Sequence, residues 1–119
     1  MKSKSIVQER LEASKNRLDI LSREVEYERI SVPELSRGLR QVGVYLESIQ
    51  NMVKTDTNVK FQRQLYERLE AGMNRLSGTI NALESSKLTG NNLSANLKQV
   101  GNTLDSFQEF LELEIEDVA

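Results

Sequence analysis

The chain has 119 residues, 29% of them charged, a formal net charge of −2 and no cysteine, histidine or tryptophan. These absences exclude disulfides, thiolate nucleophiles, the commonest general base and the commonest metal ligand, so we expect neither an enzyme nor a metal or cofactor site. No apolar run approaches the roughly 20 residues of a membrane-spanning helix. We therefore expect a cytoplasmic protein of one domain that does not associate with membranes.

The first predicted elements are two amphipathic helices over residues 4–29 and 32–53. Seam residues follow one another in steps of four and three, a 3.5-residue repeat that is typical of helices packed as in a coiled coil. The seams are Val7, Leu11, Ser14, Leu18, Leu21 and Val25, then Leu35, Leu39, Val42, Leu46, Ile49 and Val53. The intervening Ser31-Val32-Pro33-Glu34 is typical of a capping box at the start of the second helix. Together the two helices predict a first hairpin over residues 4–53.

A polar segment over residues 54–58 is the predicted linker to a second hairpin, residues 59–114. Its helices are expected at about 58–86 and 91–114, with an acidic tail over 115–119. Acidic residues oppose the dipole at a helix C-terminus, which disfavours a stable helix in the tail. The seams are Leu65, Leu69, Gly72, Leu76, Thr79 and Leu83, then Leu93, Leu97, Val100, Leu104, Phe107 and Leu111.

The two hairpins repeat one another in one fixed alignment. Residues 9–52 align with 67–110 without a gap, with 18 identities in 44 positions. We call this pairing, in which Glu9 matches Glu67, the repeat register. Many identities are polar, which two unrelated amphipathic helices would not share in one register. The two hairpins are therefore interpreted as copies of one ancestral hairpin.

Apolar residues beside the seams decide how wide the buried stripe should be. Off-seam residues such as Ile6, Ile20, Tyr45 and Ile80 are expected to widen it. A wide stripe suits a bundle of four helices better than an isolated pair. The predicted fold class is therefore all-α, a tandem duplication of an antiparallel helical hairpin that forms an elongated four-helix bundle or coiled-coil-like assembly.

One repeated arrangement is a candidate binding site. Arg10 and Arg17 flank the small Ser14, and their counterparts flank Gly72, while Gly43 and Gly101 are expected at close helix contacts. Guanidinium groups beside small residues suit an acidic partner or another anion. The alternative is structural: the arginines pair with Glu47, Asp105 and acids of their own helices, which surface ion pairs commonly do.

The function expected from these features is that of a non-enzymatic protein–protein interaction module. An adaptor, a chaperone-like protein and an inhibitor all fit, each acting through helical faces, and we expect self-association into a homo-oligomer as well as binding to another protein. The candidate partner-binding residues are Arg10, Arg17, Tyr45, Met52, Arg68, Arg75 and Phe110. The alternative is a nucleic-acid-associated accessory protein whose oligomer gathers the N-terminal lysines, although interleaved acids weaken the attraction to phosphate.

Overall fold

The computed structural model describes residues 4–55, 62–87 and 90–118. They form four α-helices and, within those ranges, no strand, which confirms the all-helical prediction. The helices are α1 (Lys4–Glu26), α2 (Val32–Thr55), α3 (Gln62–Glu84) and α4 (Gly90–Val118). In the repeat register both ends of α1 match those of α3, and the start of α2 matches that of α4.

A left-handed residue ends α1 three residues earlier than predicted. The N–H of Arg29 donates to the carbonyl of Glu24, and the N–H of Glu28, which has φ 53°, donates to Val25. This is a Schellman motif, which usually has glycine at the left-handed position. Because glutamate occupies that position here, the sequence carried no visible stop signal.

The same motif ends α3 before the predicted residue 86. Ser86, which matches Glu28 in the repeat register, has φ 61°, and the N–H of Lys87 donates to the carbonyl of Ala82. The predicted start of this helix, residues 58–61, lies outside the described residues.

Ser31 caps the start of α2 as predicted, and Glu34 reaches back to the hydroxyl of Ser31. The N–H of Glu34 donates to the Ser31 hydroxyl at 3.3 Å, and that hydroxyl donates to the Glu34 carboxylate at 2.8 Å. At its other end, α2 continues to Thr55, so the predicted linker begins two residues too early, and residues 56–58 lie outside the described residues. Likewise α4 continues to Val118, through most of the segment predicted as a separate tail.

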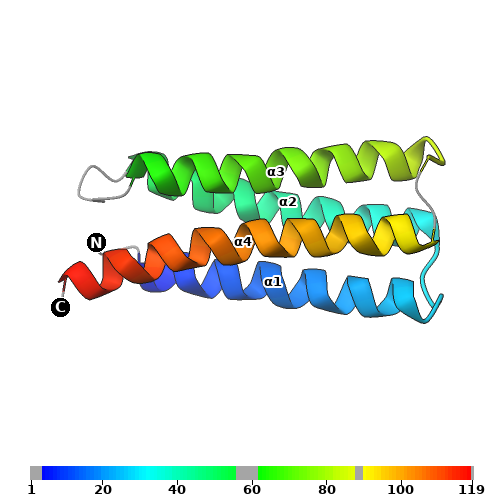
Figure 1. Cartoon of the computed structure of the whole chain (residues 1–119), viewed down its shortest axis with the longest axis horizontal. Coiled ribbons are helices and arrows are strands. Elements are labelled where there is room, and N and C mark those ends of the chain that lie inside the picture. Colours follow the sequence, from blue (N-terminus) through cyan, green and yellow to red (C-terminus); the bar gives the residue numbers. More distant parts are fainter. Residues whose placement is uncertain (1–3, 56–61, 88–89, 119) are drawn as a thin grey trace.

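The four helices lie side by side in a molecule of 44 × 21 × 19 Å, and successive helices run in opposite directions (Figure 1). Each helix packs against its neighbours along the chain, and α1 also packs against α4. The two hairpins therefore close on each other within one chain. The beginning of α1 and the end of α4 lie at the same end of the long axis (Figure 1).

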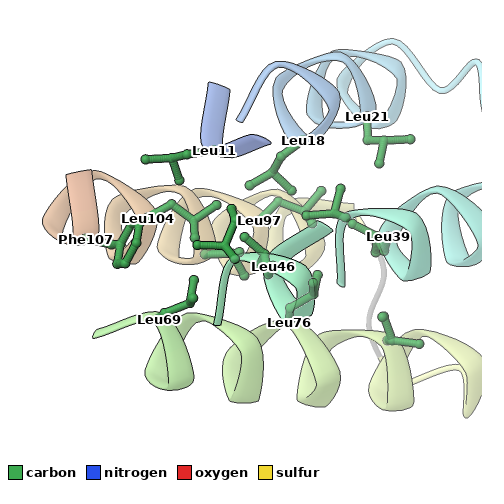
Figure 2. Packing of buried hydrophobic residues seen from close by; sticks show 14 of the residues in the cluster. Leu11, Leu18, Leu21, Leu39, Leu46, Leu69, Leu76, Leu97, Leu104 and Phe107 are labelled. Atoms are coloured by element: carbon green, nitrogen blue, oxygen red, sulfur yellow. The ribbon is translucent and has the colours of Figure 1, made fainter. Parts of the chain in front are cut away.

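The predicted seams form the core. Every seam position is buried except Val25, which is half-buried. Leucine side chains from all four helices converge between them, with Phe107 among them at one end (Figure 2). Of the off-seam residues expected to widen the stripe, Ile80 is buried, whereas Ile6, Ile20 and Tyr45 are exposed, so for these three the expectation is wrong.

The glycines occupy different environments from those expected. A Cβ at Gly43 would lie 3.7 Å from Leu76, and one at Gly101 would lie 3.9 Å from Leu18, both ordinary contacts with the other hairpin. Closer contacts lie within each hairpin: a Cβ at Gly72 would lie 3.3 Å from Cγ2 of Thr103, and one at Gly38 would lie only 2.7 Å from Cδ2 of Leu21. Absence of a side chain at residue 38 is therefore what lets α1 and α2 approach.

Candidate functional site

The predicted arginines of α1 reach across the groove between α1 and α2 to uncharged groups. The guanidinium of Arg10 donates to the Ser48 hydroxyl and, at 3.3 Å, to Sδ of Met52. One heptad further along α1, Arg17 donates to Oε1 of Gln41 at 3.2 Å. The structure thus brings Arg10 and Met52 together, and within the described ranges neither Arg10 nor Arg17 forms an ion pair with a carboxylate.

The second hairpin repeats these contacts in the repeat register. Arg75 donates to Oε1 of Gln99, as Arg17 does to its own glutamine. The guanidinium of Arg68 lies 4.6 Å from the centre of the Phe110 ring, where the first hairpin has the methionine contact. A guanidinium over an aromatic face is a favourable cation–π arrangement. The seven predicted residues therefore fall on two equivalent faces, one on each hairpin.

The carboxylates expected to pair with these arginines lie elsewhere. Asp105 pairs with Lys15 of α1 at 2.6 Å, so it faces the other hairpin. Glu47 follows Gly43 by one helical turn, which places it on the flank of α2 that faces α3. The predicted antiparallel pairing placed both acids level with the arginines along the hairpin axis. It assigned the two acids to the wrong side of their helices.

We define the first-hairpin face by the residues that border the outer groove between α1 and α2. Those of α1 again follow steps of four and three, one position before the seam, so they share one side of the helix. The face consists of Ile6, Arg10, Ala13, Arg17 and Ile20 from α1, and Arg37, Gln41, Tyr45 and Met52 from α2, and we include the exposed Val44, which precedes Tyr45 on the solvent side of α2.

Two adjoining hollows run along the first-hairpin face. One of about 360 Å³ includes Ala13 and Tyr45 in its lining, and one of about 280 Å³ includes Arg37. Both are lined by Arg17, Ile20 and Gln41, so they form one continuous groove. Ile20 is 49% exposed and Tyr45 is 43% exposed, so apolar surface remains open to solvent there.

Exposed apolar side chains are concentrated on the first hairpin. In the described part of the chain seven large apolar residues are exposed, and six of them precede residue 46; these are Ile6, Ile20, Tyr27, Val32, Val44 and Tyr45. Their counterparts in the repeat register are Gln64, Gly78, Ser85, Gly90, Asn102 and Thr103. Every counterpart is polar or glycine, so the equivalent face of the second hairpin lacks this apolar surface.

The arginines of the first-hairpin face have no carboxylate of the described chain within ion-pair distance, although Glu24 and Glu34 line the same hollow as Arg17 and Arg37. Among the described residues, Arg10, Arg17 and Arg37 form no ion pair. The nearby Glu24 is paired with Arg29 at 3.7 Å. An arginine bonded only to neutral acceptors keeps its full charge available to a partner.

Sequence reasoning identified Arg10, Arg17, Tyr45 and Met52 of this face but missed several others. The missed residues are Ile6, Ala13, Ile20, Arg37, Gln41 and Val44. The signal that could have found two of them was present: Ile20 and Val44 lie off the seam and are apolar in only one copy of the repeat. Gly38 lies at the floor of the groove. The repeat could not point to it, because the residue that matches it in the repeat register is Asn96.

The two contacts between the hairpins differ from each other. Across α2 and α3, the Glu84 carboxylate accepts from the Ser36 hydroxyl at 2.8 Å and from Arg40 at 2.5 Å. These two hydrogen bonds, that from Arg40 first, lower the pKa of Glu84 below its ordinary value of 4.5. A carboxylate that accepts two hydrogen bonds is stabilised in its charged form.

At the matching positions across α1 and α4 lie Glu26, Ser94 and Lys98. These three instead line a groove of about 490 Å³ between the helices, and no hydrogen bond or ion pair joins them in the described part of the chain. A second groove of about 630 Å³ adjoins it at Lys15. One contact between the hairpins is therefore bridged by a carboxylate, and the other is open at the same place.

Among the described residues no three His, Cys, Asp or Glu side chains are placed to hold a metal ion. None of the described helices is long and apolar enough to span a membrane. Comparison of the chain with protein-family models, with curated proteins and with solved structures found no match.

Proposed function

We propose that this protein is a non-enzymatic protein–protein interaction module that binds its partner through the first-hairpin face. The proposed architecture is an up-down-up-down four-helix bundle that arose by duplication of one hairpin. Helix boundaries, left-handed residues and arginine–glutamine bonds that match in the repeat register support the duplication. In this arrangement one hairpin has acquired the binding surface, and the other completes the core.

The observation that carries this proposal is the difference between the two faces. The hairpins share a core pattern, yet the first exposes isoleucine, valine and tyrosine where the second has polar residues or glycine. Exposed apolar surface carries a solubility cost and commonly marks an interaction site when it is contiguous. The second-hairpin face is a control within the same molecule, since stability alone would favour polar residues on both.

Self-association is a second part of the proposal. Because the hairpins pack against each other within one chain, a second copy is not needed to bury the seams, and a dimer would have to use exposed apolar residues such as Leu113, which is 44% exposed. The alternative of a nucleic-acid accessory protein depends on the N-terminal lysines. Binding to DNA or RNA at low salt in a gel shift would favour that alternative.

The experiment compares two double variants as bait in the cells of origin. Ile20→Ser with Val44→Asn gives the first-hairpin face polar residues at two exposed positions. Gly78→Ser with Asn102→Ser changes the equivalent exposed positions of the second hairpin and serves as the matched control. Affinity capture with quantitative mass spectrometry should find a protein that is retained by the wild type and by the control but lost with the first variant.

The proposal is wrong if the first variant, shown to be folded by circular dichroism, retains every protein that the wild type retains. Sedimentation of the wild type and of both variants measures self-association separately. A sedimentation mass equal to that of a single chain at all concentrations would remove the homo-oligomer from the proposal and leave the binding of another protein intact.

A further inference from the structure

We infer that the partner presents an acidic amphipathic helix, which docks lengthwise in the groove of the first-hairpin face. This inference rests on the proposed function, and it adds the chemistry of the partner. It follows from three properties of the face: the order of charged and apolar side chains along the groove, the absence of ion pairs at Arg10, Arg17 and Arg37 among the described residues, and the length of the groove.

Charged and apolar groups alternate along the groove. Arg10 lies beside Met52, and the hollow next to it contains Tyr45 together with Arg17. Further along, the second hollow contains Arg17 again with Ile20, and then Arg37. An apolar strip interrupted by cations suits a helix whose leucine-like residues enter the groove and whose carboxylates lie at its edges.

The spacing of the cations predicts a spacing in the partner. Arg10 and Arg17 are seven residues apart on α1, which is about 10.5 Å along the helix axis at 1.5 Å per residue. A docked helix that runs along the groove would present carboxylates at the same separation when they too are seven residues apart. The α1 residues that line the two hollows run from Ala13 to Glu24, about 16.5 Å along the helix axis, enough for roughly three turns of a partner helix.

Other occupants fit the face less well. A second copy docked through the same face would bring like charges together, because Arg10, Arg17 and Arg37 have no ion pairs of their own among the described residues. A flat anionic bilayer would contact little of the concave groove and would meet Glu9 and Glu12, which are exposed on the same helix. A narrow, acidic and amphipathic element matches both the shape and the charge.

The test uses two synthetic peptides of three heptads, both amphipathic helices with two leucines per heptad. The acidic peptide has glutamate beside the leucines, and the basic peptide has lysine at the same positions. Fluorescence anisotropy with the intact wild-type protein should show binding of the acidic peptide with a Kd below about 100 μM, and binding of the basic peptide at least about tenfold weaker.

Two charge reversals at equivalent positions locate the binding. Arg17→Glu should weaken binding of the acidic peptide by about tenfold or more and strengthen binding of the basic peptide. Arg75→Glu, which changes the arginine with the equivalent glutamine contact in the second hairpin, should leave both affinities unchanged. Thermal melting of each variant is the control that tests whether it remains folded.

Three results would overturn the inference. They are the absence of binding by the acidic peptide, equal binding of the two peptides, and an equal loss of affinity in Arg17→Glu and Arg75→Glu. Binding of the protein to anionic phospholipid vesicles, without binding of the acidic peptide, would assign the face to a membrane instead. If a cellular partner is lost with Ile20→Ser and Val44→Asn but retained by Arg17→Glu, the proposed function stands and the acidic partner is wrong.

Discussion

Replacement of Gly38 by alanine tests the close approach of α1 and α2. A Cβ at this position would lie 2.7 Å from Cδ2 and 3.0 Å from Cδ1 of Leu21, which is buried, so the Leu21 side chain would have to shift to make room. Overpacking of a core costs about 1–3 kcal/mol. Alanine gains about 1 kcal/mol over glycine in a helix interior. The net expectation for Gly38→Ala is a loss of about 0–2 kcal/mol in the free energy of unfolding.

Gly78→Ala measures only the difference in helix propensity between glycine and alanine. Gly78 is exposed in α3, and a Cβ there would have no neighbour within 4 Å. This variant should gain about 1 kcal/mol, so the two substitutions should differ by about 1–3 kcal/mol. Urea denaturation followed by circular dichroism measures both values under the same conditions. A gain in Gly38→Ala as large as that in Gly78→Ala would refute the close packing that we describe.

Further expectations concern the helix ends and the carboxylate between the hairpins. Glu28→Gly and Ser86→Gly should each raise the free energy of unfolding by about 0.5–1 kcal/mol, because glycine adopts positive φ without strain; no gain in either would contradict the Schellman geometry. Because hydrogen bonding lowers the pKa of Glu84, its stabilising effect should be full above about pH 4.5 and be lost as the pH falls through the lowered pKa. Wild type should therefore be more stable than Glu84→Gln at about pH 7, with a difference that shrinks on acidification. Thermal melting of the wild type and of Glu84→Gln between about pH 7 and pH 3 measures this difference, and a difference that does not shrink on acidification would contradict the bridge.

The sequence was sufficient to predict the helices and the core, because a seam in steps of four and three specifies which side of each helix is buried. Helix ends were harder to predict where a residue other than glycine adopts the left-handed conformation. Glu28 and Ser86 occupy left-handed positions that usually carry glycine, so the sequence contains no glycine stop signal at the ends of these helices. By contrast, the Ser31–Glu34 pair has standard capping chemistry and was predicted correctly.

The candidate site was only partly predictable, because height along a hairpin follows from residue numbering but the side of a helix depends on its neighbours. Asp105 is level with the second-hairpin arginines, yet it pairs with Lys15 because α1 flanks α4 on that side. Exposure was misjudged for a related reason: Ile20 adjoins the seam and looked like core, but the space beside it faces solvent and not a third helix.

The bridge at Glu84 also bears on how the molecule could come apart. Between the hairpins, α2 and α3 are consecutive in the chain and share this carboxylate, whereas α1 and α4 are far apart in the chain and flank open grooves. Lys15 still joins α1 to α4 through Asp105 at 2.6 Å. A fluctuation that parts α1 from α4 would therefore begin at the Glu26 end of their contact, where no hydrogen bond or ion pair joins Glu26, Ser94 and Lys98 in the described part of the chain.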